Sequence, residues 1–218
     1  MLTFFSGFGL GTMLTPVFMI FFPPEFAVAA TAMVHFLNNI FKLILVGKHA
    51  VKSVIISIGL PAIVGAYFGA LALGKLAHSD TILHIGPIET NFLNVVMAIL
   101  IFVFSLMELL PRLKNLEISK KFLIPGGVMS GFFGGLSGHQ GALRSAFLVK
   151  LGLSKSQFVA SGVVIACLVD TIRISTYAMF FDFAVLEESS SFLVVSPSFF
   201  TALNITSPSH GSHKCIML

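Results

Sequence analysis

Charged and amide side chains stand inside stretches that are otherwise strongly apolar, and their types and spacing could support chemistry. His35, Asn39 and Lys42 share one such stretch, and Asp170 and Arg173 share another. An ionised group at the centre of a bilayer costs about 3 kcal/mol, so such residues are functional by default. Asp170 and Arg173 can offset that cost by pairing, which would equally fit a structural ion pair that fixes two helices. Lys42 is close enough to a loop to extend its amine to water.

A further polar group occupies a glycine-rich stretch, in which Gly138-His139-Gln140-Gly141 is followed by Arg144. Arginine presents a rigid fork of donors that matches two oxygens of an oxyanion. Histidine titrates near neutrality and could relay a proton that is coupled to anion movement. The stretch therefore favours a small-anion site. The alternative is that Arg144 faces the aqueous boundary and orients the segment.

Glycine clusters interrupt two of the apolar segments. The first cluster is Gly7, Gly9 and Gly11 with Pro16, and the second is Gly134, Gly135, Gly138 and Gly141. Unwound backbone at membrane depth is tolerated only where protein or a water-filled cavity surrounds it, and matched breaks in two halves indicate a transport site. The free amides at a half-helix start suit an anion. Close helix packing through small residues is the alternative for either cluster.

Composition indicates the environment that must hold these residues. Of the 218 residues, 56% are hydrophobic and 10% are charged, and the mean hydropathy is +0.98. A soluble domain carries about 25% charged residues, so this chain cannot cover a water-facing surface. We expect an all-α integral membrane protein, a polytopic helical bundle. The formal charge of +4 falls in short loops, which indicates orientation in the bilayer rather than nucleic-acid binding.

A spanning helix needs about 20 apolar residues, and six stretches qualify: 2–22, 26–47, 53–74, 92–110, 123–151 and 157–181. The fifth is too long for one span and is broken by glycines, so two short half-helices are an alternative. We expect one permease domain over residues 1–181. Residues 182–218 are predicted to form a polar, Ser-rich tail with no spanning segment.

The distribution of lysine and arginine predicts the orientation. The loops after the second and fourth segments carry six positive residues: Lys48, Lys52, Arg112, Lys114, Lys120 and Lys121. The opposite loops carry Lys75, Lys150 and Lys155. The richer side is expected to be cytoplasmic, and the amino terminus with it, in the cell membrane.

An internal repeat is the strongest structural signal. A shift of 131 residues places Asn39 on Asp170 and Lys42 on Arg173, and it defines halves of about 1–110 and 120–181. Six simple spans would make the two repeats parallel, whereas two elements within 123–151 would allow inverted repeats. Paired broken halves predict alternating access, in which one half rocks against the other around a bound anion.

Two stretches carry a family resemblance. Residues 7–32 (GFGLGTMLTPVFMIFFPPEFAVAATA) and 131–177, above all GFFGGLSGHQGALRSAFLVKLGLSKSQFVASG, resemble the TauE/SafE family of sulfite and organosulfur-anion permeases, also called the toluene-sulfonate uptake permease family. The resemblance covers about residues 3–181. It implies a polytopic permease for sulfite, sulfonates or related small anions, without a cofactor. Members usually have a longer lead and further apolar segments at the end, so the resemblance also implies a chain shortened at both ends.

The predicted site combines backbone amides with polar side chains. The substrate-binding residues expected are Gly11, Gly138, His139, Gln140, Gly141 and Arg144, with Asn39, Asp170 and Arg173 lining or gating the path. The expected partners are a small anion, with a proton as a coupling option, and the lipid bilayer. No metal, cofactor or nucleic acid is expected. The identity of the anion, the direction of transport and the oligomeric state stay open.

Two other functions compete with transport. Residues 135–138 fit the Gly-x-Ser-Gly of rhomboid-like intramembrane serine proteases, and His35 with Asn39 fits their His-x-x-x-Asn. A serine nucleophile needs a base within hydrogen-bond reach, yet residues 157–181 contain no histidine and the chain contains no tryptophan, so a protease is disfavoured. The other alternative is a membrane subunit that transports nothing.

Overall fold

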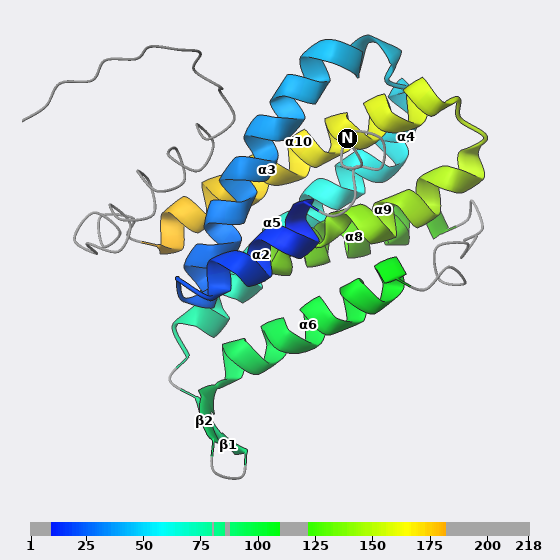
Figure 1. Ribbon diagram of the computed structural model, residues 1–218. Coiled ribbons are helices and arrows are strands. Elements are labelled where there is room, and N and C mark those ends of the chain that lie inside the picture. The colour runs from blue at the N-terminus through cyan, green and yellow to red at the C-terminus, as the bar shows by residue number, and fades with distance from the viewer. Residues whose placement is uncertain (1–9, 80, 86–87, 110–121, 182–218) are drawn as a thin grey trace, which may run out of the picture. The chain divides into compact units, whose positions relative to one another are not determined.

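Within the described part of the chain, three helical segments are long and apolar enough to cross a membrane (Figure 1). They are α3 (Pro24–Val46), the run of α4 (Lys52–Val54), a π-helical turn (Ile55–Gly59) and α5 (Leu60–Ala77), and α10 (Lys155–Phe180). The computed structural model describes residues 10–79, 81–85, 88–109 and 122–181. These helices lie within a few residues of the stretches expected from hydropathy.

Two other expected spans lie only partly within the described residues. α6 (Phe92–Leu109) follows a hairpin of β1 (Ile82–Ile85) and β2 (Ile88–Asn91), which pair antiparallel with Ile82 opposite Asn91. α2 (Leu10–Met19) has ten residues and contains Pro16. Gly11 lies within α2, while Gly7 and Gly9 lie outside the described residues. The expected tail, 182–218, also lies outside them.

The fifth apolar stretch forms two helices, as the half-helix alternative predicted. α8 (Leu123–Ser137) and α9 (Gln140–Leu148) are separated by Gly138 and His139, and a 3-10 turn (Val149–Leu151) follows α9. Gly138 has a φ of 84° in the left-handed region, which glycine adopts without steric cost. The break thus requires one glycine of the cluster.

The polarity of the bundle is the reverse of that of a soluble protein. Large apolar side chains face outwards, among them Ile20, Ile44 and Met179, which are 76%, 79% and 80% exposed. Polar side chains lie inside, with Asp170 and Arg173 both at 0% exposure. A lipid environment makes this arrangement favourable, because lipid can surround the outer apolar side chains while the polar groups find hydrogen-bond partners inside the protein. The chain is an all-α membrane protein.

Backbone contact joins α5 to α8. A Cβ at Gly131 of α8 would come within 2.0 Å of the Ala62 carbonyl oxygen, and one at Gly135 within 2.2 Å of that of Ala66. Conversely, a Cβ at Gly65 of α5 would approach the Val128 carbonyl oxygen to 2.0 Å. Small residues allow such approach in membranes. The packing alternative therefore describes Gly135, which does not interrupt a helix.

The contacts also give the direction of each helix. Phe26 near the start of α3 contacts Phe181 after the end of α10, and the Val51 amide beyond α3 donates to Ser161 Oγ near the start of α10 at 3.0 Å. α3 and α10 are therefore antiparallel. A Cβ at Gly74, near the end of α5, would meet the Phe180 ring at 2.7 Å, so α5 and α10 end together.

These directions correct the expected distribution of lysines. Leu151 and Leu153 pack with Val51 on one hydrophobic cluster, so the turn before α10 lies at the same end of the bundle as the turn after α3. The prediction that Lys155 lies opposite Lys52 is wrong. It failed because it counted 123–151 as one crossing, whereas the chain turns back at the break.

Candidate functional site

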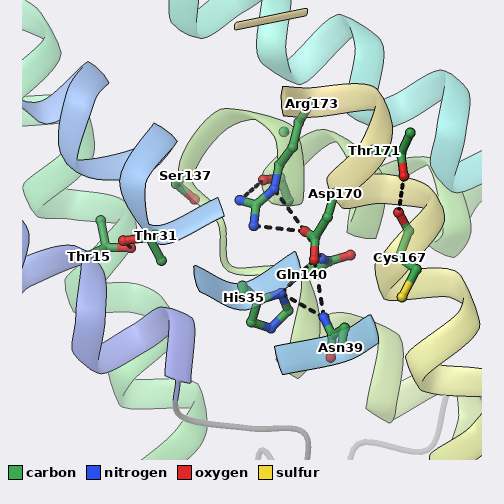
Figure 2. A network of polar contacts seen from close by, with 12 residues as sticks. Thr15, Thr31, His35, Asn39, Ser137, Gln140, Cys167, Asp170, Thr171 and Arg173 are labelled. Carbon is green, nitrogen blue, oxygen red and sulfur yellow. Dashed lines mark hydrogen bonds and ion pairs between the residues drawn. The ribbon is translucent and has the colours of Figure 1, made fainter. Parts of the chain in front are cut away.

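Asp170 on α10 lies at the centre of a buried polar network (Figure 2). Its Oδ1 accepts hydrogen bonds from Arg173 Nε at 2.9 Å and from Gln140 Nε2 at 3.0 Å, and Arg173 Nη2 lies 2.8 Å away. Its Oδ2 accepts from Asn39 Nδ2 at 3.1 Å and pairs with His35 Nδ1 at 2.8 Å. A carboxylate has about four lone-pair sites, so these donors occupy its accepting capacity.

Helix periodicity explains why these groups meet. His35 and Asn39 are four residues apart and share one face of α3, while Asp170 and Arg173 are three apart on α10. Because an ionised carboxylate can only accept, the hydrogen bond between His35 and Asp170 requires a proton on His35 Nδ1. The predicted pairing of Asp170 with Arg173 is confirmed. The pair lies within one helix, and α3 and α9 are joined to it by the neutral donors.

Side chains of α10 also donate hydrogen bonds to backbone carbonyls at the end of α8. The last carbonyls of a helix have no donor within that helix. Gly134 O receives the Gly138 amide at 3.0 Å and Arg173 Nη1 at 3.2 Å, and Gly135 O receives the Tyr177 hydroxyl. The cost of ending α8 inside the bundle is thereby offset by α10.

The start of α9 differs from the end of α8 in its hydrogen bonds. Its N-cap, His139, makes no capping hydrogen bond through its side chain. Among the described residues, no side chain accepts from the amides of Gln140, Gly141 or Ala142, for which the helix itself supplies no acceptor. The positive end of the α9 dipole and these donors therefore remain available to a negatively charged group.

Arg144 lies one turn beyond Gln140 on α9 and is 5% exposed, so it does not face the aqueous boundary. Its Nη1 donates to Gln140 Oε1 at 3.3 Å, and the Gln140 amide thus links Arg144 to Asp170. Within the described part of the chain, no carboxylate forms an ion pair with Arg144. Lys42 is buried too, and it lies close enough for its charge to interact with that of Arg144.

Gly138 forms the turn between the two helices, beside the network. A Cβ on Gly138 would meet Arg173 Nη1 at 3.1 Å and Thr15 Oγ1 of α2 at 3.8 Å. Thr15 is buried and donates to Thr31 Oγ1 of α3 at 3.4 Å. The turn therefore lies against α2 and α10, and Thr15 joins it to α3.

His139 completes the turn and is 3% exposed. Its ring stacks on Phe104 of α6, with centroids 5.3 Å apart and planes 7° apart. Ser137 Oγ donates its hydrogen to Phe133 O at 3.0 Å. His139 Nδ1 lies 3.1 Å from Ser137 Oγ, so in this pattern His139 is the donor and Ser137 the acceptor. In the neutral ring Nε2 is then an acceptor, and no described residue is its partner.

The structure brings most of the predicted site residues together. Asn39, Gln140, Asp170 and Arg173 are in direct contact, and Arg144, Gly138 and His139 adjoin them. Gly141 lies in the first turn of α9. Gly11 lies in α2, and the residues before α2 are outside the described part. Sequence reasoning assigned no role to Thr15, Phe104 or Tyr177, because their roles depend on contacts between distant helices.

A protein-family model described as Sulfite exporter TauE/SafE matches residues 1–203. The chain belongs to this family. No curated protein and no solved structure matches the chain. The TauE/SafE family is a family of membrane transporters of anions, and the resemblance stated on residues 7–32 and 131–177 is confirmed.

Among the described residues of this TauE/SafE protein, the contacts of Ser137 differ from those of a serine-protease nucleophile. Ser137 is fully buried, and its hydroxyl hydrogen is directed to Phe133 O. His35 donates to Asp170, and His139 donates to Ser137 instead of accepting its hydrogen. In this hydrogen-bond pattern neither His35 nor His139 accepts the Ser137 hydrogen, as a catalytic base would.

Proposed function

We propose that this protein moves a small oxyanion, such as sulfite, a sulfonate or a related organosulfur anion, across the cell membrane, and that the anion binds at the start of α9. One observation carries the proposal. The helix ends on the two sides of the break differ in their hydrogen bonds. Side chains of α10 donate hydrogen bonds to the last carbonyls of α8, whereas the first amides of α9 have no described side-chain acceptor. A helix start with buried basic residues beside it favours a negatively charged ligand.

The local charges support the same conclusion. Asp170 and Arg173 neutralise each other, and the remaining donors on Asp170 are neutral or histidine. Arg144 therefore adds a positive charge that the described carboxylates do not match. Electrostatic attraction at short range is stronger in a site that water does not screen. An arginine there also offers two-point contact to an oxyanion.

Asp170 and Arg173 then have a positioning role. Their network joins α3, α8, α9 and α10 and fixes the turn at Gly138 next to the proposed site. We propose that Asn39 contributes to this framework as well. The anion would contact the α9 amides, Gln140 and Arg144.

Alternating access is the proposed mechanism, with one condition that the packing sets. The seam between α5 and α8 joins the predicted halves 1–110 and 120–181 through backbone contact. Rocking the halves apart would open that seam and expose closely packed backbone. We propose that α5 and α8 move as one body and that access changes around the other faces of α8 and α9.

His139 is the proposed group for proton coupling. Its Nε2 is a buried acceptor at the turn where the anion would bind. We place the end of the bundle that carries Lys48, Lys52 and Lys155 in the cytoplasm, since these lysines outnumber Lys75 at the other described end. The amino terminus would then be cytoplasmic too.

Flux measurements on the purified full chain in liposomes test the proposal. Sulfite and an aliphatic sulfonate are loaded inside, and their release is followed for the parent protein, Arg144→Ala, Arg144→Lys and the control Lys155→Ala. Loss of a charged hydrogen-bond partner predicts roughly ten- to hundredfold slower flux for Arg144→Ala. Arg144→Lys keeps the charge and should retain part of the flux, while exposed Lys155 should not matter.

Two results would contradict the proposal. If the parent protein, correctly folded in the bilayer, released neither anion, a non-transporting membrane subunit would be the better interpretation. If flux occurred but Arg144→Ala matched Lys155→Ala, transport would stand and the binding site would lie elsewhere.

A further inference from the structure

α8 and α9 fold back along each other. A Cβ on Gly126, near the start of α8, would come within 2.2 Å of the Phe147 ring, near the end of α9. Closer to the turn, Ser130 Oγ donates to Gln140 O at 3.1 Å, and a Cβ on Gly134 would meet Gln140 Cβ at 2.8 Å. The start of α8 thus lies beside the end of α9, and the end of α8 lies beside the start of α9, so the two helices are antiparallel.

Neither helix is long enough to cross the bilayer alone. The 15 residues of α8 span about 22 Å and the nine of α9 about 14 Å, against a hydrocarbon core of about 30 Å. Leu123 at the start of α8 and Leu151 after α9 pack on the same hydrophobic cluster, together with Val51. The chain therefore enters and leaves this element at one end of the bundle.

We propose that α8 and α9 form a re-entrant hairpin and that the two halves of the chain are consequently an inverted repeat. The hairpin removes one crossing from the simple count of spans. A helix after it must run opposite to the direction that six full crossings would give. This explains why α10 is antiparallel to α3, the helix with which the sequence repeat aligns it.

The repeat of 131 residues matches helix to helix in this arrangement. Residues 24–46 of α3 correspond to 155–177, within α10, and residues 10–19 of α2 correspond to 141–150, which overlap α9. Contacts correspond as well. Thr15 of α2 contacts Thr31 of α3, and Gly162, the counterpart of Thr31, faces the Arg144 and Leu148 side chains of α9, each 3.7 Å from an added Cβ.

The antiparallel helices cross at equivalent positions. Asn39 and Asp170 differ by 131 residues and are hydrogen-bonded to each other. The pairs on either side, Phe26 with Phe181 and Val51 with Ser161, lie at opposite ends of the same crossing. Such a contact is expected where a pseudo-two-fold axis in the membrane plane passes between two repeats.

The hairpin is tested by the side of the membrane that each lysine position occupies, a measurement independent of transport. In a full chain carrying Cys167→Ala and Cys215→Ala, single variants Lys52→Cys, Lys75→Cys and Lys155→Cys are treated in intact cells with a membrane-impermeant maleimide, then again after permeabilisation. All three lysines are exposed, so every variant should react once the membrane is opened.

We expect Lys52→Cys and Lys155→Cys to show the same loss of labelling in intact cells, and Lys75→Cys to react there. If Lys52→Cys and Lys155→Cys react from opposite sides, the hairpin crosses the membrane and the proposal is wrong. Reaction of both from the outside supports the hairpin while reversing the orientation proposed above.

A second measurement tests the same arrangement without the cysteine-free protein, in case that protein does not fold. The pair Val51→Cys and Ser161→Cys in the otherwise unchanged chain should form a disulfide on mild oxidation, because the Val51 amide lies 3.0 Å from Ser161 Oγ. The control pair Lys75→Cys and Ser161→Cys should not. Cross-linking of the control pair in preference to the first would overturn the antiparallel arrangement.

Discussion

Asn39 Nδ2 donates a hydrogen bond to Asp170 Oδ2 at 3.1 Å, although 131 residues separate the two positions in the chain. Asn39 belongs to α3 and Asp170 to α10, and the bond is buried. A neutral donor and a charged acceptor thus occupy matching places in the two predicted repeats. The asymmetry allows the contact, since two carboxylates at this distance would repel each other.

Substitutions of Asn39 should reveal this asymmetry. Asn39→Ala removes one of the donors on Asp170 and should lower the free energy of unfolding by about 1–3 kcal/mol. Asn39→Asp places a second carboxylate next to Asp170 and should be more destabilising, despite its similar size. Thermal denaturation of the purified variants, followed by size-exclusion chromatography after heating, measures the order. Equal stability of the two variants would contradict the assigned contact.

The turn at Gly138 can be examined against a natural control. Gly138 and Gly152 both have a positive φ, 84° and 64°, so alanine at either position strains the backbone by about 1–2 kcal/mol. A Cβ at Gly138 would also meet Arg173 Nη1 at 3.1 Å, whereas Gly152 has nothing within 4 Å. Gly138→Ala should therefore slow anion flux in liposomes, while Gly152→Ala should lose only stability. A Gly152→Ala variant as slow as Gly138→Ala would contradict this role of the turn.

Gly131 of α8 and Gly162 of α10 should tolerate alanine according to which atoms face them. A Cβ at Gly131 would lie 2.0 Å from the Ala62 carbonyl oxygen, so Gly131→Ala must part α5 from α8. The nearest atoms to a Cβ at Gly162 are side-chain atoms at 3.7 Å, an ordinary contact. We expect Gly131→Ala to reduce the amount of folded protein recovered from membranes strongly, and Gly162→Ala to match the parent. Recovery of Gly131→Ala at the parent level would show that the helices can separate at little cost.

Proton coupling can be separated from anion binding at His139. His139→Asn keeps a side-chain donor near Ser137 but removes the Nε2 acceptor. We expect sulfite flux to persist while the accompanying change in internal pH, read with a trapped dye, is lost. His49→Asn, at an exposed position after α3, is the matched control and should behave as the parent does. An unchanged pH signal in His139→Asn would assign the proton to another group.

Hydropathy and helix periodicity were sufficient for much of the fold. They placed α3, α6 and α10 within a few residues, and the spacing of Asp170 and Arg173 indicated their pairing. The start of α10 was expected at residue 157 and lies at Lys155, where Ser154 and Gln157 form a capping box. That Ser-x-x-Gln pattern is a local signal for a helix start, and it could have located the boundary.

The direction of each helix could not be predicted from the hydrophobic pattern. Hydrophobic runs report the length of a segment and not which way the chain leaves it, so the return of α9 along α8 could not be predicted from 123–151 alone. The same limit applies to the glycines, because Gly135 and Gly138 are near neighbours of one type with different roles. The contact of Phe104 with His139 depends on α6, about 35 residues earlier, and carries no local signal.

The seam between α5 and α8 has a consequence for the route of the anion. Where a carbonyl oxygen leaves no room for a single Cβ, as between Gly131 and Ala62, it leaves none for water or a hydrated ion. At Gly131 and Gly135 this side of α8 is therefore packed too closely against α5 for water to enter. The route that we propose for the anion therefore lies on the side of α8 that carries α9, next to Gln140 and Arg144.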